Sequence, residues 1–297
     1  MKLFMLLLAA ISCCSSGFQD PSDKNVAAIV NGLEISNARV DQQLKISLGK
    51  REIPDVMLPR LRSEALDHLI NRHLVLESIE SSGIKAGPSM IAYKISNLED
   101  RLKEIGKSMD DHLTQTKTSR DELQYEFRWQ VAWEKYLEKF LTDQNLQKHY
   151  SKNQRKFDGT QVRVSHVLLK NDSENSLQTA NQIREQIVSG KLSWNDAVKQ
   201  HSIAESSVAD HGDVGWINYN GPMVPAFCHA AIELNPGDIS RGVNSSFGIH
   251  LIQCNEIKPG KIGLSDARKI VRDDAMQFLF EKLAAKKKRS AKIVFPK

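Results

Sequence analysis

The sequence contains few cysteines and, beyond its first residues, no long apolar run. Four cysteines occur in 297 residues, too few for a small fold held together by disulfide bonds. Neither a Cys-x-x-Cys nor a His-Glu-x-x-His spacing is present, so the common zinc motifs are absent. The apolar run at residues 3–11 is too short to cross a bilayer. These absences argue against a disulfide-stapled miniprotein, a zinc-dependent protein and a membrane-embedded one.

Length and composition indicate a folded protein with more than one domain. A chain of 297 residues has room for two domains of ordinary size, and 40% hydrophobic residues is typical of a globular protein. The net charge of +5 is diffuse except for the basic run from Lys286 to Arg289. Because this run ends an amphipathic pattern, we interpret it as the solvated end of a helix and expect no nucleic-acid partner.

Residues 1–17 resemble a secretory signal peptide. A basic residue precedes the apolar run, and small residues follow it at positions 12–17, as in a cleavage region. Residues 10–13 (AISC) also resemble a bacterial lipobox, with alanine in place of the usual leucine. Two outcomes stay open: ordinary cleavage, or lipidation of Cys13 with attachment to a membrane. Both predict an extracytoplasmic protein, in the periplasm or cell envelope.

Residues 25–157 are predicted to form a mainly helical domain. A hairpin is expected over residues 26–35, because Asn31-Gly32 is a favoured two-residue turn. Apolar residues then recur at three- and four-residue steps in segments that end near residues 83, 106 and 140. The last of these opens with a capping box at residues 119–122 (SRDE). Since none of these helices carries a catalytic signature, we interpret their apolar stripes as packing surface.

From about residue 158 the pattern changes to a compact mixed α/β unit. Strands are predicted at 161–169, 215–217, near 239 and at 248–257, with helices at 177–190, 193–198 and 224–234. A long helix at 264–288 and a strand at 291–295 are expected to end the chain. Cys228 falls on a predicted helix and Cys254 on a predicted strand, so we expect two separately buried thiols rather than one disulfide.

The two longer strands of this unit each carry a histidine among apolar neighbours. Because strand residues alternate between faces, His166 shares a face with Val164, and His250 shares one with Ile252. A buried histidine needs a hydrogen-bond partner or a functional role. From the strands alone, two core histidines and a functional pair are both open.

Five motifs, in order, resemble the parvulin family of peptidyl-prolyl isomerases. They are residues 164–169 (VSHVLL), 212–216 (GDVGW), 223–227 (MVPAF), 234–240 (LNPGDIS) and 247–252 (FGIHLI). The flanks, which begin with VAAIVNG and end in a helix and a strand, resemble exported bacterial foldases with a single such module. The sequence is therefore similar to a foldase in which the isomerase domain is inserted into a chaperone domain.

This resemblance implies an α+β fold. A mainly helical chaperone domain would be built from the N-terminal segment 25–157 and the C-terminal segment 259–297. The parvulin-like domain at 158–258, a small mixed sheet surrounded by helices, would be inserted between them. The final strand would then pair with the segment near residues 28–30.

The resemblance also implies a site. Met223 and Phe227 would form a slot for the proline ring, with Val214 on its wall. His166 and His250 would lie behind the slot as the paired histidines of the family, where they orient each other and tune the electrostatics. No metal and no cofactor would be required.

One loop departs from the family pattern. The family usually has Cys or Asp after a Tyr-Ser-x stretch, and the best alignment places Ala204 at that position, with Glu205 one step away. A shift of one residue would let Glu205 supply the carboxylate. Without that shift, a polar group is missing and turnover should be weak.

The resulting functional hypothesis is a peptidyl-prolyl cis-trans isomerase that acts on X-Pro bonds of unfolded clients without a covalent intermediate. Its partners would be unfolded or nascent exported polypeptides that contain proline. The alternative is a non-catalytic extracytoplasmic holdase chaperone that binds proline-containing segments.

Overall fold

The computed structural model describes residues 25–49, 51, 53–116 and 118–296. The predicted signal peptide at 1–17 and Cys13 lie outside the described residues. The chain divides into two compact units, Met1–Tyr136 with Phe280–Lys297, and Leu137–Leu279. Within the described ranges, no helix has the length and apolar character needed to cross a membrane.

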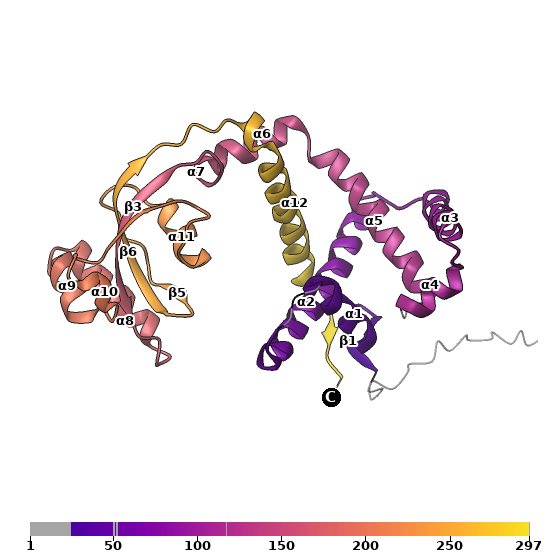
Figure 1. Ribbon diagram of the computed structural model, residues 1–297, viewed down its shortest axis with the longest axis horizontal. Coiled ribbons are helices and arrows are strands. Elements are labelled where there is room, and N and C mark those ends of the chain that lie inside the picture. Colours follow the sequence, from indigo (N-terminus) through magenta and orange to yellow (C-terminus); the bar gives the residue numbers. More distant parts are fainter. Residues whose placement is uncertain (1–24, 50, 52, 117, 297) are drawn as a thin grey trace, which may run out of the picture. The chain divides into compact units, whose positions relative to one another are not determined.

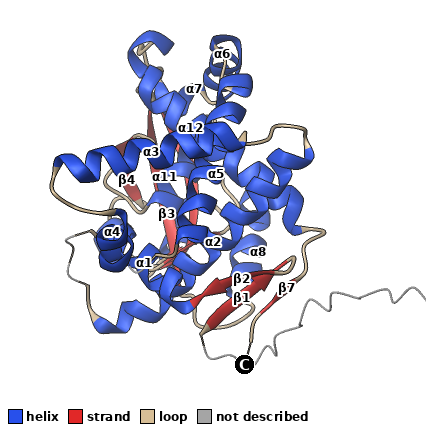
Figure 2. Cartoon of the chain, turned by 90° about the vertical axis from the view of Figure 1, so that its right-hand side faces the viewer, coloured by secondary structure: helices blue, strands red, loops and turns tan. Residues whose placement is uncertain are grey.

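The first unit contains a three-stranded antiparallel sheet in the order β2–β1–β7 (Figure 2). Its strands are β1 (Val26–Val30), β2 (Leu33–Ser36) and β7 (Ile293–Val294). Asn31 and Gly32 join the first two strands with φ values of 51° and 92°, as the predicted two-residue turn requires. Val30 of β1 lies opposite Ile293 of β7. The predicted pairing of the last strand with the segment near residues 28–30 is therefore confirmed.

Helices make up the rest of the first unit. They are α1 (Asn37–Leu48), the 3-10 turn η1 (Asp55–Met57), α2 (Leu58–Ser81), α3 (Pro88–Glu104), α4 (Met109–Thr116), most of α5 (Arg120–Phe140) and the end of α12 (Leu264–Lys288). The capping box at the start of α5 forms as predicted: the N–H of Glu122 donates to Ser119 Oγ (3.1 Å), and the N–H of Ser119 donates to the Glu122 carboxylate (2.8 Å). Helix α1 was not predicted as a separate element, and Val40 is its buried residue.

The basic run of the first unit lies at the end of α12. Lys286, Lys288 and Arg289 are exposed, and Lys287 Nζ lies 3.6 Å from a carboxylate oxygen of Glu77. This placement agrees with the interpretation of the run as a solvated helix end.

The second unit is built around a four-stranded antiparallel sheet in the order β4–β3–β6–β5. The strands are β3 (Gln161–Leu169), β4 (Asp213–Ile217), β5 (Val243–Ser245) and β6 (Gly248–Lys258). The helices other than α12 are α6 (Asp143–Lys152), α7 (Gln154–Phe157), α8 (Ser176–Val188), α9 (Trp194–His201), α10 (Glu205–Val208) and α11 (Pro225–Ile232).

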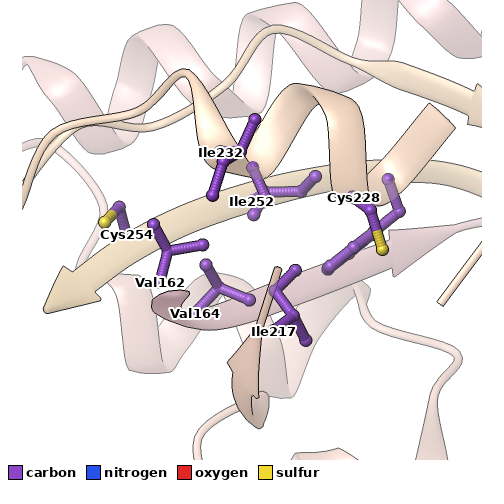
Figure 3. Packing of buried hydrophobic residues seen from close by; sticks show 9 residues of the cluster. Val162, Val164, Ile217, Cys228, Ile232, Ile252 and Cys254 are labelled. Carbon is purple, nitrogen blue, oxygen red and sulfur yellow. The ribbon is translucent and has the colours of Figure 1, made fainter. Parts of the chain in front are cut away.

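Helices cover both faces of this sheet, and each face has its own core. In Figure 1, α11 lies on one side of β3 and β6, and α8 and α9 lie on the other. The core under α11 contains Val164, Phe227, Ile252 and both cysteines, Cys228 and Cys254 (Figure 3). The two thiols are free and separately buried, as expected. The opposite face has a second core that includes Val167, Leu169, Ile249 and Leu251.

The edge strand of this sheet differs from the prediction. Ile239, where a strand was expected, makes only an isolated bridge to Gln253. The strand beside β6 is instead β5, which forms a tight hairpin with it, Ser245 lying opposite Gly248. A three-residue strand that buries no residue fully leaves no alternating apolar pattern, which is why the sequence did not reveal it. The predicted domain limits at 158 and 258 stay predictions, since the compact unit extends from 137 to 279.

Candidate functional site

The two histidines meet on the α11 face of the sheet. His166 on β3 lies opposite Ile252 of β6, and His250 lies opposite Leu168, so the histidines are diagonal neighbours on the same face. Their Nδ1 atoms are 3.3 Å apart and their rings stack at a centroid distance of 5.5 Å. Only 6% of His166 and 2% of His250 is exposed. The strands thus bring the two imidazoles into direct contact in a buried position.

Burial disfavours the charged form of both imidazoles. Burial lowers the pKa of His166 below its usual value. Burial, together with the adjacent His166, lowers the pKa of His250 to about 4. Because a neutral imidazole has one N–H and one bare nitrogen, one Nδ1 donates and the other accepts in the contact between them. Protonation of both rings would place two donors against each other and break this hydrogen bond.

Ser245 extends the pair on the His250 side. Its Oγ lies 2.8 Å from His250 Nε2. The same oxygen accepts the N–H of Phe247 at 3.1 Å and lies 3.2 Å from the carbonyl oxygen of Gly248. Ser245 therefore holds the second nitrogen of His250 and fixes the orientation of its ring. Ser245 could not be singled out from the sequence, because β5, the strand that places it, has no pattern of its own.

Phe227 of α11 packs edge-on against both imidazoles. Its ring centroid lies 5.8 Å from that of His166 and 5.2 Å from that of His250, at interplanar angles near perpendicular (82° and 79°). No part of Phe227 is exposed, while Met223 and Val214 are half-buried against the same core. The structure therefore brings together the three residues predicted for the proline slot and the histidine pair. Phe227 lies at the bottom of this group, and Met223 and Val214 lie nearer the surface.

The loop that departs from the family pattern lies against β3. The N–H of Ile203 donates to the carbonyl of Leu168 (2.8 Å), and Ser202 Oγ accepts the N–H of Leu168 (3.2 Å). Leu168 is the residue opposite His250, so the loop runs close to the histidine pair. Ala204 is half-buried beside Ser202, and Glu205 is exposed as the first residue of α10.

Two glycines permit the close packing around the histidines. Gly212 has φ +83°, and a Cβ at this position would lie 2.3 Å from the carbonyl oxygen of His166. The N–H of His166 donates to the Gly212 carbonyl at 2.8 Å. Gly248 has φ +139°, and a Cβ there would lie 2.2 Å from the carbonyl oxygen of Leu169. Any side chain at either position would push β3 away from its neighbour.

The described residues around the histidine pair include neither a cluster of metal-ligating side chains nor an exposed thiol. Within the described residues, no group of three or more His, Cys, Asp or Glu side chains is placed to hold a metal ion. Both thiols of the second unit are buried, and burial raises the pKa of each, which disfavours the reactive thiolate. The remaining elements are an apolar surface and, beneath it, the hydrogen-bonded imidazole pair with Ser245.

The chain is similar to several known proteins. Residues 163–256 match the Rotamase family, described as the PPIC-type PPIase domain. The chain is 34% identical over 134 residues to foldase protein PrsA 1 of Bacillus cereus, across 45% of this chain and 42% of the relative. It therefore spans less than half the length of that protein. Foldase protein PrsA of Clostridium botulinum is 24% identical over 300 residues, 91% of this chain and 88% of the relative. A crystal structure of the peptidylprolyl isomerase PrsA from Bacillus anthracis covers 76% of this chain and 96% of its own, with 18% identity and a TM-score of 0.37.

Proposed function

We propose that this protein is a peptidyl-prolyl cis-trans isomerase that assists the folding of exported proteins, because residues 163–256 match the PPIC-type PPIase domain. The observation that carries the proposal is the hydrogen-bonded pair His166–His250, buried against Phe227 next to Met223. Its clients would be unfolded or nascent exported polypeptides that contain proline.

The chemistry needs only an environment that favours a twisted amide. Rotation about an X-Pro bond has a barrier of roughly 18–20 kcal/mol, because the twisted state loses its resonance. Uncatalysed exchange takes tens to hundreds of seconds, which is slow enough to limit folding. A catalyst must therefore bind the twisted amide more tightly than the planar one, and no covalent intermediate is required.

Each residue of the site has a role in this proposal. Met223, Phe227 and Val214 bind the proline ring by apolar contact and keep water from it. His166 and His250 lie behind this slot and hold it in shape through their mutual hydrogen bond, while their dipoles act on the amide. Glu205, one residue beyond Ala204, supplies a carboxylate near the rotating bond.

The segments on either side of the parvulin-like domain also have roles in the proposed function. The parvulin-like domain would extend over 158–258, and segments 25–157 and 259–297 would form one chaperone domain that holds unfolded clients. Residues 1–17 would direct export, with lipidation of Cys13 as the means of membrane attachment. A protein that acts on unfolded exported chains needs such a location.

The isomerase proposal is tested on the full chain. Wild-type protein should accelerate cis-trans exchange in a proline-containing peptide, and Met223→Ala should lower kcat/KM by about tenfold through the lost contact with the proline ring. Met90→Ala is the matched control, because Met90 lies on α3 in the first unit and is 44% exposed. Absence of acceleration by the wild-type chain would refute the isomerase proposal, and equal rates in wild type and Met223→Ala would refute the slot.

A second candidate function is supported by the loop at 202–205. Ala204 stands where the family usually has a hydrogen-bonding side chain, and Glu205 is exposed. A protein with this loop could bind proline-containing segments without accelerating their isomerisation, as a holdase. Suppression of aggregation of an unfolded client by a chain that shows no isomerase activity would favour this function.

A further inference from the structure

Met223, a residue of the proposed slot, ends a loop that is contacted by a residue outside the family-matched segment 163–256. The loop begins after β4 with a turn in which the N–H of Gly221 donates to the carbonyl of Asn218 (3.0 Å). At its end, Cys228 Sγ lies 3.6 Å from the Met223 carbonyl oxygen. Tyr219 and Met223 both pack against the core under α11. Met223 follows Tyr219 by four positions in the same loop, so a displacement of the Tyr219 ring would also displace Met223.

Two side chains contact the Tyr219 ring. It stacks on the imidazole of His229, with centroids 4.0 Å apart and planes 7° from parallel. The Nζ of Lys156 lies 4.7 Å from the ring centroid, within the range of a cation–π interaction. His229 belongs to α11, but Lys156 belongs to α7, which precedes the matched domain.

Lys156 is held in turn by Asp274 of α12. One carboxylate oxygen of Asp274 pairs with Lys156 Nζ, and the other lies 2.7 Å from His149 Nε2 on α6. The ring of His149 also packs against Phe157 and Phe278, at 6.0 and 5.6 Å between centroids. About a quarter or less of the Lys156, Asp274 and His149 side chains is exposed. We call His149, Lys156, Tyr219, His229 and Asp274 the Tyr219 cluster.

We infer that the Tyr219 cluster positions Met223, so that Asp274 and Lys156, outside the family-matched segment 163–256, act as positioning residues of the isomerase site. This inference rests on the proposed function. All five residues and Met223 belong to the unit Leu137–Leu279, so α6, α7 and the first part of α12 support the isomerase site from the flanking segments. The chain then binds proline well only when its C-terminal helix is in place.

The test uses the full chain and one control on the same helix. Asp274→Asn removes the charge that holds Lys156, whereas Asp273→Asn changes the neighbouring exposed carboxylate, whose partner is Lys269 at 3.2 Å. Tyr219→Leu removes the ring that His229 and Lys156 contact. Because a displaced slot wall weakens proline binding in ground and transition states alike, we expect Asp274→Asn and Tyr219→Leu to raise KM about tenfold with little change in kcat. Asp273→Asn should match wild type.

A spectroscopic readout separates this inference from the proposed function. The methyl resonance of Met223 in protein labelled with 13C at methionine methyl groups, assigned with Met223→Leu, should shift in Asp274→Asn and stay in place in Asp273→Asn. If the wild type lacks isomerase activity, the proposed function fails, while the resonance still reports on positioning. An unchanged Met223 resonance in Asp274→Asn would overturn the inference, as would a KM equal to that of wild type. Asp274 is partly exposed, so its isosteric replacement leaves the core intact.

Discussion

The Nδ1 atoms of His166 and His250 lie 3.3 Å apart across two neighbouring strands. Since each strand supplies one histidine and the register makes them diagonal neighbours, the contact exists only when β3 and β6 are correctly aligned. The contact between the two histidines therefore requires the folded sheet, and it also belongs to the candidate site. Its properties lead to specific expectations for pH, stability and activity.

The low pKa of His250 predicts a loss of stability in mild acid. In the unfolded chain the imidazole has a pKa near its usual value of 6.5, whereas in the folded protein the pKa is about 4. The unfolded state therefore binds more protons between these values, and stability falls as the pH decreases from about 6.5 to about 4. The loss attributable to His250 is about 3 kcal/mol across this window.

Chemical denaturation at a series of pH values measures this effect. A His250→Gln variant should show a smaller dependence of the free energy of unfolding on pH than wild type, whatever its stability at neutral pH. His166, whose pKa is also lowered, contributes in the same direction and remains in both proteins. Parallel curves for wild type and His250→Gln would contradict the prediction.

Ser245→Ala should weaken both stability and activity. The change leaves the buried Nε2 of His250 without its 2.8 Å partner, which costs about 1–3 kcal/mol. A ring free to reorient no longer supports the slot, and we expect kcat/KM to fall by about tenfold, equivalent to about 1.4 kcal/mol. Ser246→Ala is the matched control, because Ser246 is exposed in the same hairpin. If both variants retain wild-type rates and midpoints, Ser245 has no part in the site.

Phe227→Ala should mainly unfold the protein. The side chain is fully buried and touches both histidines, so its truncation is expected to cost about 3–5 kcal/mol. Met223→Ala, at a half-buried position, should cost much less and affect proline binding instead. Denaturation midpoints of the two variants, measured beside their isomerase rates, distinguish these effects. Equal midpoints would show that Phe227 is less important to the core than its burial indicates.

Much of the fold could be predicted because it follows from local chemistry. The Asn31-Gly32 turn, the Ser119 capping box and the strand at 161–169 depend on residues close together in sequence. Alternation along each strand also predicted which neighbours share a face with each histidine: Val164 with His166 on β3, and Ile252 with His250 on β6. Their direct contact required the resemblance, because strand periodicity alone does not give the register.

The parts that were missed depend on distant contacts. Ser245 becomes significant only when β5 pairs with β6, and a three-residue strand has no periodicity of its own. Asp274 and Lys156 are 118 residues apart in sequence and meet Tyr219 only in the folded unit. Neither residue lies in the segment that carries the family motifs, so no motif could point to them.

Gly212→Ala should be far more destabilising than an ordinary glycine substitution. Both Gly212 and Gly237 have positive φ values, +83° and +90°, but a Cβ at Gly237 meets no atom within 4 Å. Gly237→Ala should therefore lower the free energy of unfolding only through backbone strain, by about 1–2 kcal/mol. At Gly212 the added methyl group would lie 2.3 Å from the His166 carbonyl oxygen, and we expect a total cost above about 4 kcal/mol. Thermal denaturation of both variants measures the difference, and similar midpoints would show that the loop can move away from β3.

We expect the loop at 202–205 to set how strongly the protein catalyses. If Glu205 supplies the carboxylate that acts near the rotating amide, Glu205→Gln should lower kcat by about tenfold or more, because a preorganised charge is lost. Ala204→Asp introduced into that variant should restore part of the rate, since it places a carboxylate where the family usually has a polar side chain. Glu174→Gln, which alters an exposed carboxylate in another loop of the same unit, controls for the change in net charge. Wild-type kcat in Glu205→Gln, combined with a faster Ala204→Asp single variant, would mean that the natural loop lacks its polar group and that the protein acts mainly by binding.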